Sequence, residues 1–142
     1  MTKPFSLHPQ LQQDTIELTE FPLCKLLLCN DSNYPWFILV PKIADAQELY
    51  QLSWQDQQQF LNESSMLSEI LMQTFNGDKM NVAALGNVVE QLHIHHVVRY
   101  KSDICWPKPI WGQQKAIPYT TENLTALKEK LLPKLNHILS VM

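Results

Sequence analysis

Three of the five histidines in the chain lie within one ten-residue stretch, QLHIHHVVRY, which ends at Tyr100. Side chains alternate across a β-strand, so a strand here would place His93 and His95 on one face, with their Cβ atoms about 7 Å apart. His96 would point to the opposite, mostly apolar face. We therefore expect His96 to lie at the edge of the core or in a subunit contact, bonded to one partner.

The His93/His95 pair is compatible with three roles. Imidazole is a common zinc ligand, but zinc would need further ligands, and no cysteine or carboxylate occurs at a suitable spacing, so no metal site is predicted. Histidine can also attack phosphorus and form a covalent intermediate, while a neighbouring imidazole handles protons near neutral pH. The third role is purely structural. The pattern alone leaves these three interpretations open.

The elements that must position the histidines can be read from apolar spacing. Two apolar runs, Leu23–Asn30 and Trp36–Pro41, flank a short polar loop and predict an antiparallel hairpin. Ser53 is a candidate helix N-cap, and apolar residues then recur at helical spacing as far as Phe75, before a stop at Asn76 and Gly77. This stripe is interpreted as core packing.

The remaining elements complete a β-β-α-α-β-β-α order. The sequence predicts a short helix over 45–52, a strand over 80–85, the histidine strand over 89–100 and a last helix from Thr121, in which Pro133 should cause a kink or a restart. Two prolines, two tryptophans and a glycine exclude regular structure in DICWPKPIWGQQ. Residues 1–142 are therefore predicted to form a single α+β domain, with an antiparallel sheet and helices on one face.

Composition limits the classes of function. The chain has 142 residues, 45% of them apolar, and a net charge of −3. No basic run is present that could neutralise phosphates, so neither nucleic acid nor a membrane is expected as a partner. The three cysteines suggest free thiols in a reducing compartment. The N-terminus has no apolar segment of signal-peptide length, so we expect a soluble, cytoplasmic protein.

Glycine is scarce, and neither G-x-G-x-x-G nor G-x-x-x-x-G-K-[ST] occurs. A nucleotide would have to be bound by another device. The segment LGNVVEQLHIHHVVR resembles such a device, the signature of the histidine triad (HIT) superfamily, His-φ-His-φ-His-φ-φ (φ apolar) preceded by Gly-Gln-Ser/Thr. Gly86 and Asn87 match the glycine and glutamine, and the histidine positions become Gln91, His93 and His95. The match is closest to a bacterial HIT-like branch with Gln at the first position and a WP-x-P-[VI]-WG segment, here WPKPIWG.

The resemblance implies a HIT-like fold, with an antiparallel sheet of about five strands, and nucleotide chemistry without a cofactor. In this family the middle histidine, here His93, attacks the α-phosphorus of a nucleoside phosphate conjugate, and water releases the nucleotide. The resemblance also assigns His95 to the phosphate and the leaving-group oxygen, Asn87 to the phosphate and Asn30 to the ribose. For Asn30, a turn or strand-end role is an equal alternative.

Further roles follow from the physical logic of the site. Backbone N–H groups around Asn87 and Val88, and a protonated His95, could stabilise developing charge. Trp111 could stack on a base or only pack its loop against the sheet. The family resemblance also implies a homodimer and a small nucleotide as the partner.

Three departures from the family pattern concern activity. Gln91 can hydrogen-bond but cannot titrate, Val88 lacks the hydroxyl of Ser/Thr, and the second strand, in YPWFILV, lacks the histidine of many relatives. The leading hypothesis is a hydrolase or nucleotidyl transferase acting through His93. The alternatives are a nucleotide- or phosphometabolite-binding module without turnover, and a metal-binding protein.

Overall fold

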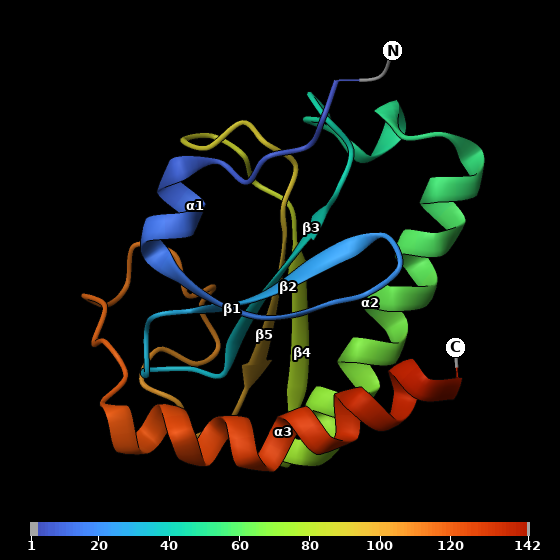
Figure 1. Cartoon of the computed structure of the whole chain (residues 1–142). Coiled ribbons are helices and arrows are strands. Elements are labelled where there is room, and N and C mark those ends of the chain that lie inside the picture. The colour runs from blue at the N-terminus through green and yellow to red at the C-terminus, as the bar shows by residue number, and fades with distance from the viewer. Residues whose placement is uncertain (1–2, 142) are drawn as a thin grey trace.

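A computed structural model describes residues 3–141 and contains one antiparallel sheet of five strands in the order β1-β2-β3-β5-β4 (Figure 1). The histidine strand β5 is central, because it pairs with β3 on one side and β4 on the other. The register places His95 opposite Ile38 of β3 and Ala83 of β4. The five strands are β1 Thr15–Glu20, β2 Cys24–Cys29, β3 Trp36–Pro41, β4 Lys79–Ala83 and β5 Ile94–Arg99.

Two long helices, α2 (Trp54–Phe75) and α3 (Thr121–Val141), pack on one face of the sheet (Figure 1). The Ser53 hydroxyl accepts the Asp56 backbone N–H and caps α2, as its sequence predicts. The helix ends at Asn76, which adopts the left-handed conformation that commonly closes helices. Within residues 3–141, no helix combines the length and the apolar character needed to cross a membrane.

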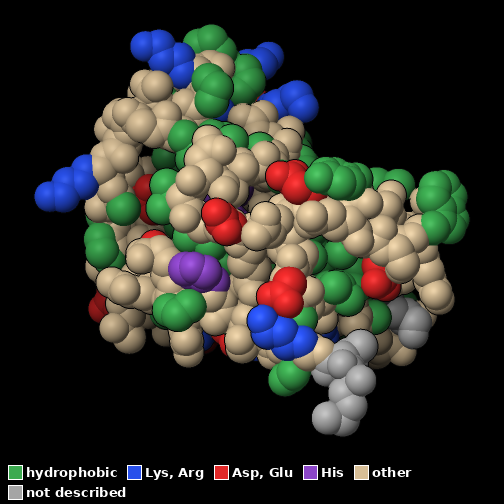
Figure 2. All heavy atoms as spheres, turned by 90° about the horizontal axis from the view of Figure 1, so that it is seen from above, with side chains coloured by type: hydrophobic (Ala, Val, Ile, Leu, Met, Phe, Trp, Pro, Cys, Tyr) green, Lys and Arg blue, Asp and Glu red, His purple; other side chains and the backbone are tan. Residues whose placement is uncertain are grey.

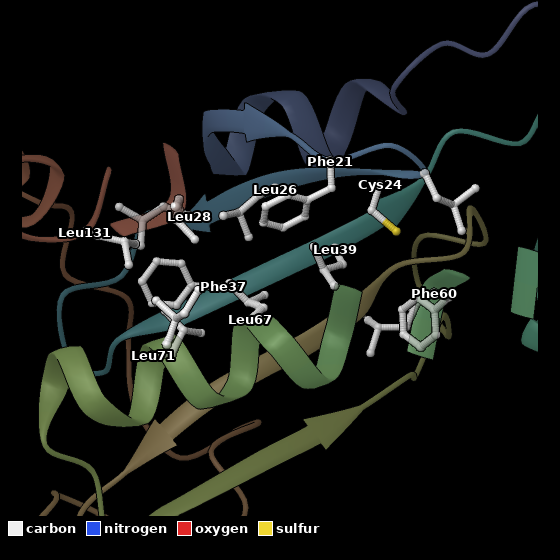
Figure 3. Packing of buried hydrophobic residues seen from close by; sticks show 14 of the residues in the cluster. Phe21, Cys24, Leu26, Leu28, Phe37, Leu39, Phe60, Leu67, Leu71 and Leu131 are labelled. Atoms are coloured by element: carbon white, nitrogen blue, oxygen red, sulfur yellow. The ribbon is translucent and has the colours of Figure 1, made fainter. Parts of the chain in front are cut away.

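The main core lies between the sheet and these helices (Figure 3). Inward-facing residues of β2 and β3 alternate along their strands and meet the apolar stripe of α2 and one leucine row of α3. Each of these buried side chains stabilises the fold by about 1.5–3 kcal/mol relative to exposure. The residues at the centre of this core are Leu26, Leu28, Phe37, Leu39, Leu67, Leu71, Leu131 and Leu135.

The opposite face of the sheet is covered by irregular chain and by the short helix α1 (Pro9–Asp14). Leu11 of α1 packs on Leu27 and Ile38. Ile110 of the WPKPIWG segment (residues 106–112) and Cys105 just before it pack on Val97. This second layer packs on the face of the sheet that carries His95, so this face is partly buried.

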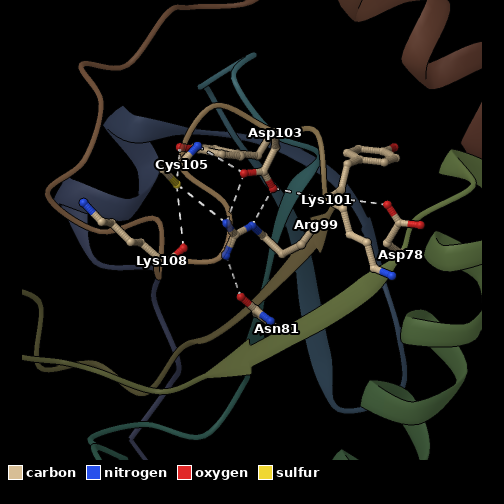
Figure 4. A network of polar contacts seen from close by, with 9 residues as sticks. Asp78, Asn81, Arg99, Lys101, Asp103, Cys105 and Lys108 are labelled. Carbon is tan, nitrogen blue, oxygen red and sulfur yellow. Dashed lines mark hydrogen bonds and ion pairs between the residues drawn. The ribbon is translucent and has the colours of Figure 1, made fainter.

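Arg99 fixes the WPKPIWG region to the end of β5 (Figure 4). Its guanidinium donates to both carboxylate oxygens of Asp103, at 2.7 and 3.1 Å, and to Asn81 Oδ1 at 2.9 Å. The side chain is only 1% exposed, and it also lies over the rings of Tyr34 and Trp106. A fully paired arginine of this kind positions the loop rather than a ligand.

Several boundaries differ from the sequence prediction. The predicted helix over 45–52 is wrong, because only a 3-10 turn, η1 (Leu49–Gln51), forms there. Strand β1 and helix α1 were not predicted, since their apolar pattern is weak, and α3 continues through Pro133. The histidine strand begins at Ile94 instead of residue 89, so His93 lies just before regular pairing starts.

Candidate functional site

His93 is held by its own chain. Its Nδ1 lies 2.7 Å from the backbone carbonyl oxygen of Gln91. A carbonyl oxygen can only accept, so Nδ1 carries the proton and Nε2 keeps a lone pair. No group within residues 3–141 hydrogen-bonds to Nε2. The local backbone therefore orients an imidazole whose free nitrogen is a nucleophile.

His95 has the opposite proton arrangement. The indole N–H of Trp36, at the start of β3, donates to His95 Nδ1 at 2.9 Å. An indole can only donate, so Nδ1 is the unprotonated nitrogen and a neutral His95 carries its proton on Nε2. Burial lowers the pKa of His95 to about 3, with a further contribution from the neighbouring imidazoles of His93 and His96. The sequence interpretation of His95 as an ionised group is not what this environment favours.

His96 faces the helix layer and is fully buried. Its Nδ1 lies 3.1 Å from the Ile94 carbonyl, and its Nε2 lies 2.7 Å from the Ser64 hydroxyl on α2. Burial lowers its pKa to about 4. His96 lies on the apolar face, as the sequence predicts, but it is inside the core instead of at its edge and both ring nitrogens are hydrogen-bonded instead of one.

The rings of His93 and His95 lie side by side. Their centroids are 5.0 Å apart, and the rings meet edge to face at 70°. Their exposed fractions are 8% and 6%, so each retains a small solvent-facing area. On the face shown in Figure 2, histidine contributes only one small patch of the surface. The pair thus places the nucleophilic Nε2 of His93 beside the neutral N–H donor of His95, and both side chains are largely buried.

Trp111 of the WPKPIWG segment completes the aromatic surroundings of His95. Its ring contacts His95 edge to face at 5.2 Å and Trp36 at 6.1 Å. Trp36 thus occupies Nδ1 of His95 with its indole N–H, and Trp111 packs against the ring of the same imidazole. The sequence analysis did not predict Trp36 as a site residue. Its only signal for this region was that the strand lacks the histidine that many relatives have there.

The Gln91 side chain binds the N-terminal segment. Its amide oxygen accepts the His8 backbone N–H at 2.8 Å, and its amide nitrogen donates to the Ser6 carbonyl at 2.9 Å. Only the backbone of Gln91 bonds to His93. No sequence signal connects residues more than 80 positions apart in this way.

The loop before β5 carries the other predicted phosphate ligands. Gly86 has a φ of +72°, a conformation that favours glycine, Asn87 is exposed, and the side chain of Val88 is 90% exposed. Val88 and Gln91 line a cleft of about 450 Å³ between this loop, residues 44–47 and the N-terminal segment. His93 and His95 do not line this cleft; Gln91, whose backbone carbonyl bonds to His93, does.

Asn30 and Trp111 are the other two predicted ligand contacts. Asn30 follows β2, and its amide oxygen accepts the Tyr119 backbone N–H at 2.9 Å, so it anchors the chain before α3. Trp111 lines a second, open hollow of about 570 Å³ along β4. The structure therefore brings His93, His95 and Trp111 together, but gives Asn30 a strand-end contact.

Residues 3–141 contain no group of three or more His, Cys, Asp or Glu side chains arranged to hold a metal ion. The cysteines are free thiols, and burial raises the pKa of Cys29 to about 12. The candidate reactive groups of the site are therefore the imidazoles of His93 and His95 and the neighbouring backbone.

Comparison with protein-family models matches residues 10–102 to the HIT domain. A comparison with curated proteins gives no match.

Solved structures share both fold and sequence with the chain. A histidine triad protein from Marinobacter aquaeolei VT8 is 52% identical, with a TM-score of 0.93, over 95% of this chain and 98% of its own. A histidine triad protein from Bradyrhizobium japonicum is 39% identical, with a TM-score of 0.91, over 93% and 98%. One from Sinorhizobium meliloti 1021 is 36% identical, with a TM-score of 0.88, over 91% and 96%.

Proposed function

The chain belongs to the HIT domain family, and on this premise we propose that it hydrolyses or transfers nucleoside phosphate conjugates through a covalent nucleotidyl-His93. Family membership indicates nucleotide-related hydrolase, transferase or binding chemistry. The observation that carries the specific proposal is the Nδ1–H bond from His93 to the Gln91 carbonyl, which leaves Nε2 with a free lone pair.

The first step is displacement at the α-phosphorus. The Nε2 lone pair of His93 forms a P–N bond as the bond from phosphorus to the leaving group breaks, and the leaving group takes the electron pair. The positive charge that develops on the ring is stabilised by the Gln91 carbonyl at 2.7 Å. In the second step, water attacks phosphorus and the P–N electron pair returns to Nε2.

Phosphate binding is assigned to His95 and to the loop before β5. The N–H at Nε2 of His95 donates to a non-bridging oxygen, and backbone N–H groups near Asn87 and Val88 supply further donors beside Gly86. Neutral donors fixed by the fold need no reorganisation during the reaction, which is the main contribution a protein makes to phosphoryl transfer. In this proposal Trp111 borders the bound nucleotide and Gln91 positions His93 through its backbone.

The test compares wild type with His93→Ala on nucleoside phosphoramidates, dinucleoside polyphosphates and nucleotidylated amines. Wild type should release nucleoside monophosphate. When the reaction is quenched in base, peptide mass spectrometry should show a nucleotide attached to His93. The folded His93→Ala variant should be at least about 1,000-fold slower. His137→Ala, an exposed histidine on α3, is the matched control.

A non-catalytic binding module is the second candidate. Gln91 has its side chain committed to residues 6 and 8, and Val88 offers no hydroxyl to a phosphate. If wild type binds nucleoside monophosphates by calorimetry but turns over no conjugate, this function replaces the first.

The remaining parts of the proposal follow from the family resemblance. We place the protein in the cytoplasm as a homodimer with a small nucleotide ligand and no resident cofactor. Sedimentation equilibrium gives the assembly state directly.

A further inference from the structure

Trp36 controls the proton of the second imidazole in the site. Its indole N–H donates to His95 Nδ1 at 2.9 Å, and the ring of Trp111 packs against the same imidazole at 5.2 Å. Protonating His95 at Nδ1 would set two N–H groups against each other at an imidazole that is only 6% exposed. The bond therefore selects one neutral tautomer and opposes the imidazolium.

The charged surroundings of His95 also oppose protonation. The titratable groups nearest to it are His93 beside it and His96 on the next residue, and both disfavour a further positive charge. No carboxylate within residues 3–141 hydrogen-bonds to His95. Asp103, in the turn that follows β5, accepts two hydrogen bonds from Arg99.

We propose that Trp36 is a positioning residue that fixes His95 as a neutral N–H donor, and that the site therefore selects nucleotide conjugates whose leaving group departs as a stable anion. This inference rests on the proposed function. Phosphoanhydrides, such as dinucleoside polyphosphates, are this class, because phosphate and polyphosphate leave without taking a proton. Phosphoramidates, in which the leaving group is an amine, are the disfavoured class, since an amine must be protonated as it departs.

The reaction balances without an acid. His93 Nε2 forms the P–N bond, the P–O bond of the anhydride breaks, and the electron pair stays on the departing polyphosphate oxygen. His95 keeps its proton throughout, because losing it would create an imidazolate. When water completes the cycle, its proton passes to solvent and His93 regains its lone pair.

The tautomer can be tested without any substrate. Nitrogen-15 NMR of the full chain, with His95 assigned by comparison with His95→Ala, should show protonated Nε2 and bare Nδ1, unchanged from pH 8 to pH 5. The neutral form of His93 should show the reverse pattern, with the proton on Nδ1. In Trp36→Phe, which keeps an aromatic ring but lacks the N–H, His95 should mix tautomers and its pKa should rise. Trp111→Phe is the matched control, since Trp111 touches His95 through its ring and should leave the tautomer as it is.

The selectivity is measured with two conjugates of the same nucleotide, a dinucleoside polyphosphate and a phosphoramidate of a simple alkylamine. Wild type should prefer the anhydride by at least about 100-fold in kcat/KM, the size of a missing general acid. Trp36→Phe should reduce this preference at least about tenfold, because His95 can then ionise.

The outcomes separate the two proposals. Wild type that prefers the amine, or His95 with its proton on Nδ1, overturns this inference while the covalent mechanism stands. A wild type that turns over neither conjugate overturns the proposed function, and with it the selectivity. The anhydride preference together with the Trp36-dependent tautomer supports both.

Discussion

His95 and His96 are consecutive residues of one strand, yet they differ in every respect that matters for chemistry. His96 has both ring nitrogens bonded, one to the Ile94 carbonyl and one to Ser64, and lies in the main core. His95 has Nδ1 bonded to Trp36, and its Nε2 has no hydrogen-bond partner within residues 3–141. Both have lowered pKa values, so a shifted pKa alone does not separate the structural imidazole from the chemical one.

The partner of each ring decides its role. A backbone carbonyl forces the proton onto Nδ1 in both His93 and His96, but only His93 then has a free Nε2. An indole donor reverses the proton position in His95. In the proposed mechanism the three imidazoles therefore serve as one nucleophile, one donor and one packed core group.

The lowered pKa that His95 and His96 share should make the stability of the fold depend on pH. Their folded pKa values, about 3 and about 4, lie below the unfolded value near 6.5, so the unfolded chain binds protons first as pH falls. Stability is thus complete above pH 6.5 and decreases below it. By pH 5 each residue should cost about 2 kcal/mol, or about 4 kcal/mol together.

Urea unfolding at pH 7 and pH 5 measures this loss. His96→Gln should retain only about half of the pH dependence. An unfolding free energy that is equal at both pH values would contradict the neutral state assigned to the two rings.

Removing the core imidazole should affect stability and not turnover. His96→Ala leaves a cavity and an unpaired buried Ser64 hydroxyl, which together should cost about 3 kcal/mol. Chemical denaturation gives the loss, and kcat per folded molecule should stay at the wild-type value. A selective loss of kcat would place His96 in the reaction.

Removing the neighbouring imidazole should have the reverse effect. His95→Ala eliminates one donor to the phosphate and should lower kcat about 100-fold on the preferred conjugate. Steady-state kinetics on protein shown to be folded by circular dichroism makes the measurement. Unaltered kcat in that variant would remove His95 from the phosphate site.

The smallest effect concerns the partner of His96. Ser64→Ala deletes the donor to Nε2 and should cost about 1–2 kcal/mol, since the buried ring nitrogen is left unsatisfied. Ser68→Ala, one turn along α2, removes only a hydroxyl bonded to the Ser64 carbonyl and should stay within about 0.5 kcal/mol of wild type. Equal losses in the two variants would show that the Ser64–His96 bond is not special.

The elements with strong periodicity could be predicted. The Trp36–Pro41 strand, the Ser53 cap, the Asn76 stop and the α+β sheet are confirmed, because local spacing and capping chemistry define them. The helix over 45–52 failed because its buried apolar residues, Ala46 and Leu52, pack into the core from irregular chain on either side of a 3-10 turn. β1 was missed because it is an edge strand whose partners determine it more than its own pattern does.

For the site, the sequence by itself determined which residue types could react and which face of a strand each would occupy. His93 and His95 were separated from His96 by alternation alone. Tertiary structure decided the proton on each ring, because the Gln91 carbonyl, Trp36 and Ser64 reach these rings through contacts that spacing does not encode. It also decided that the Gln91 amide holds residues 6 and 8. A hydrogen bond depends on where two groups meet in space, and only the folded chain brings these groups together.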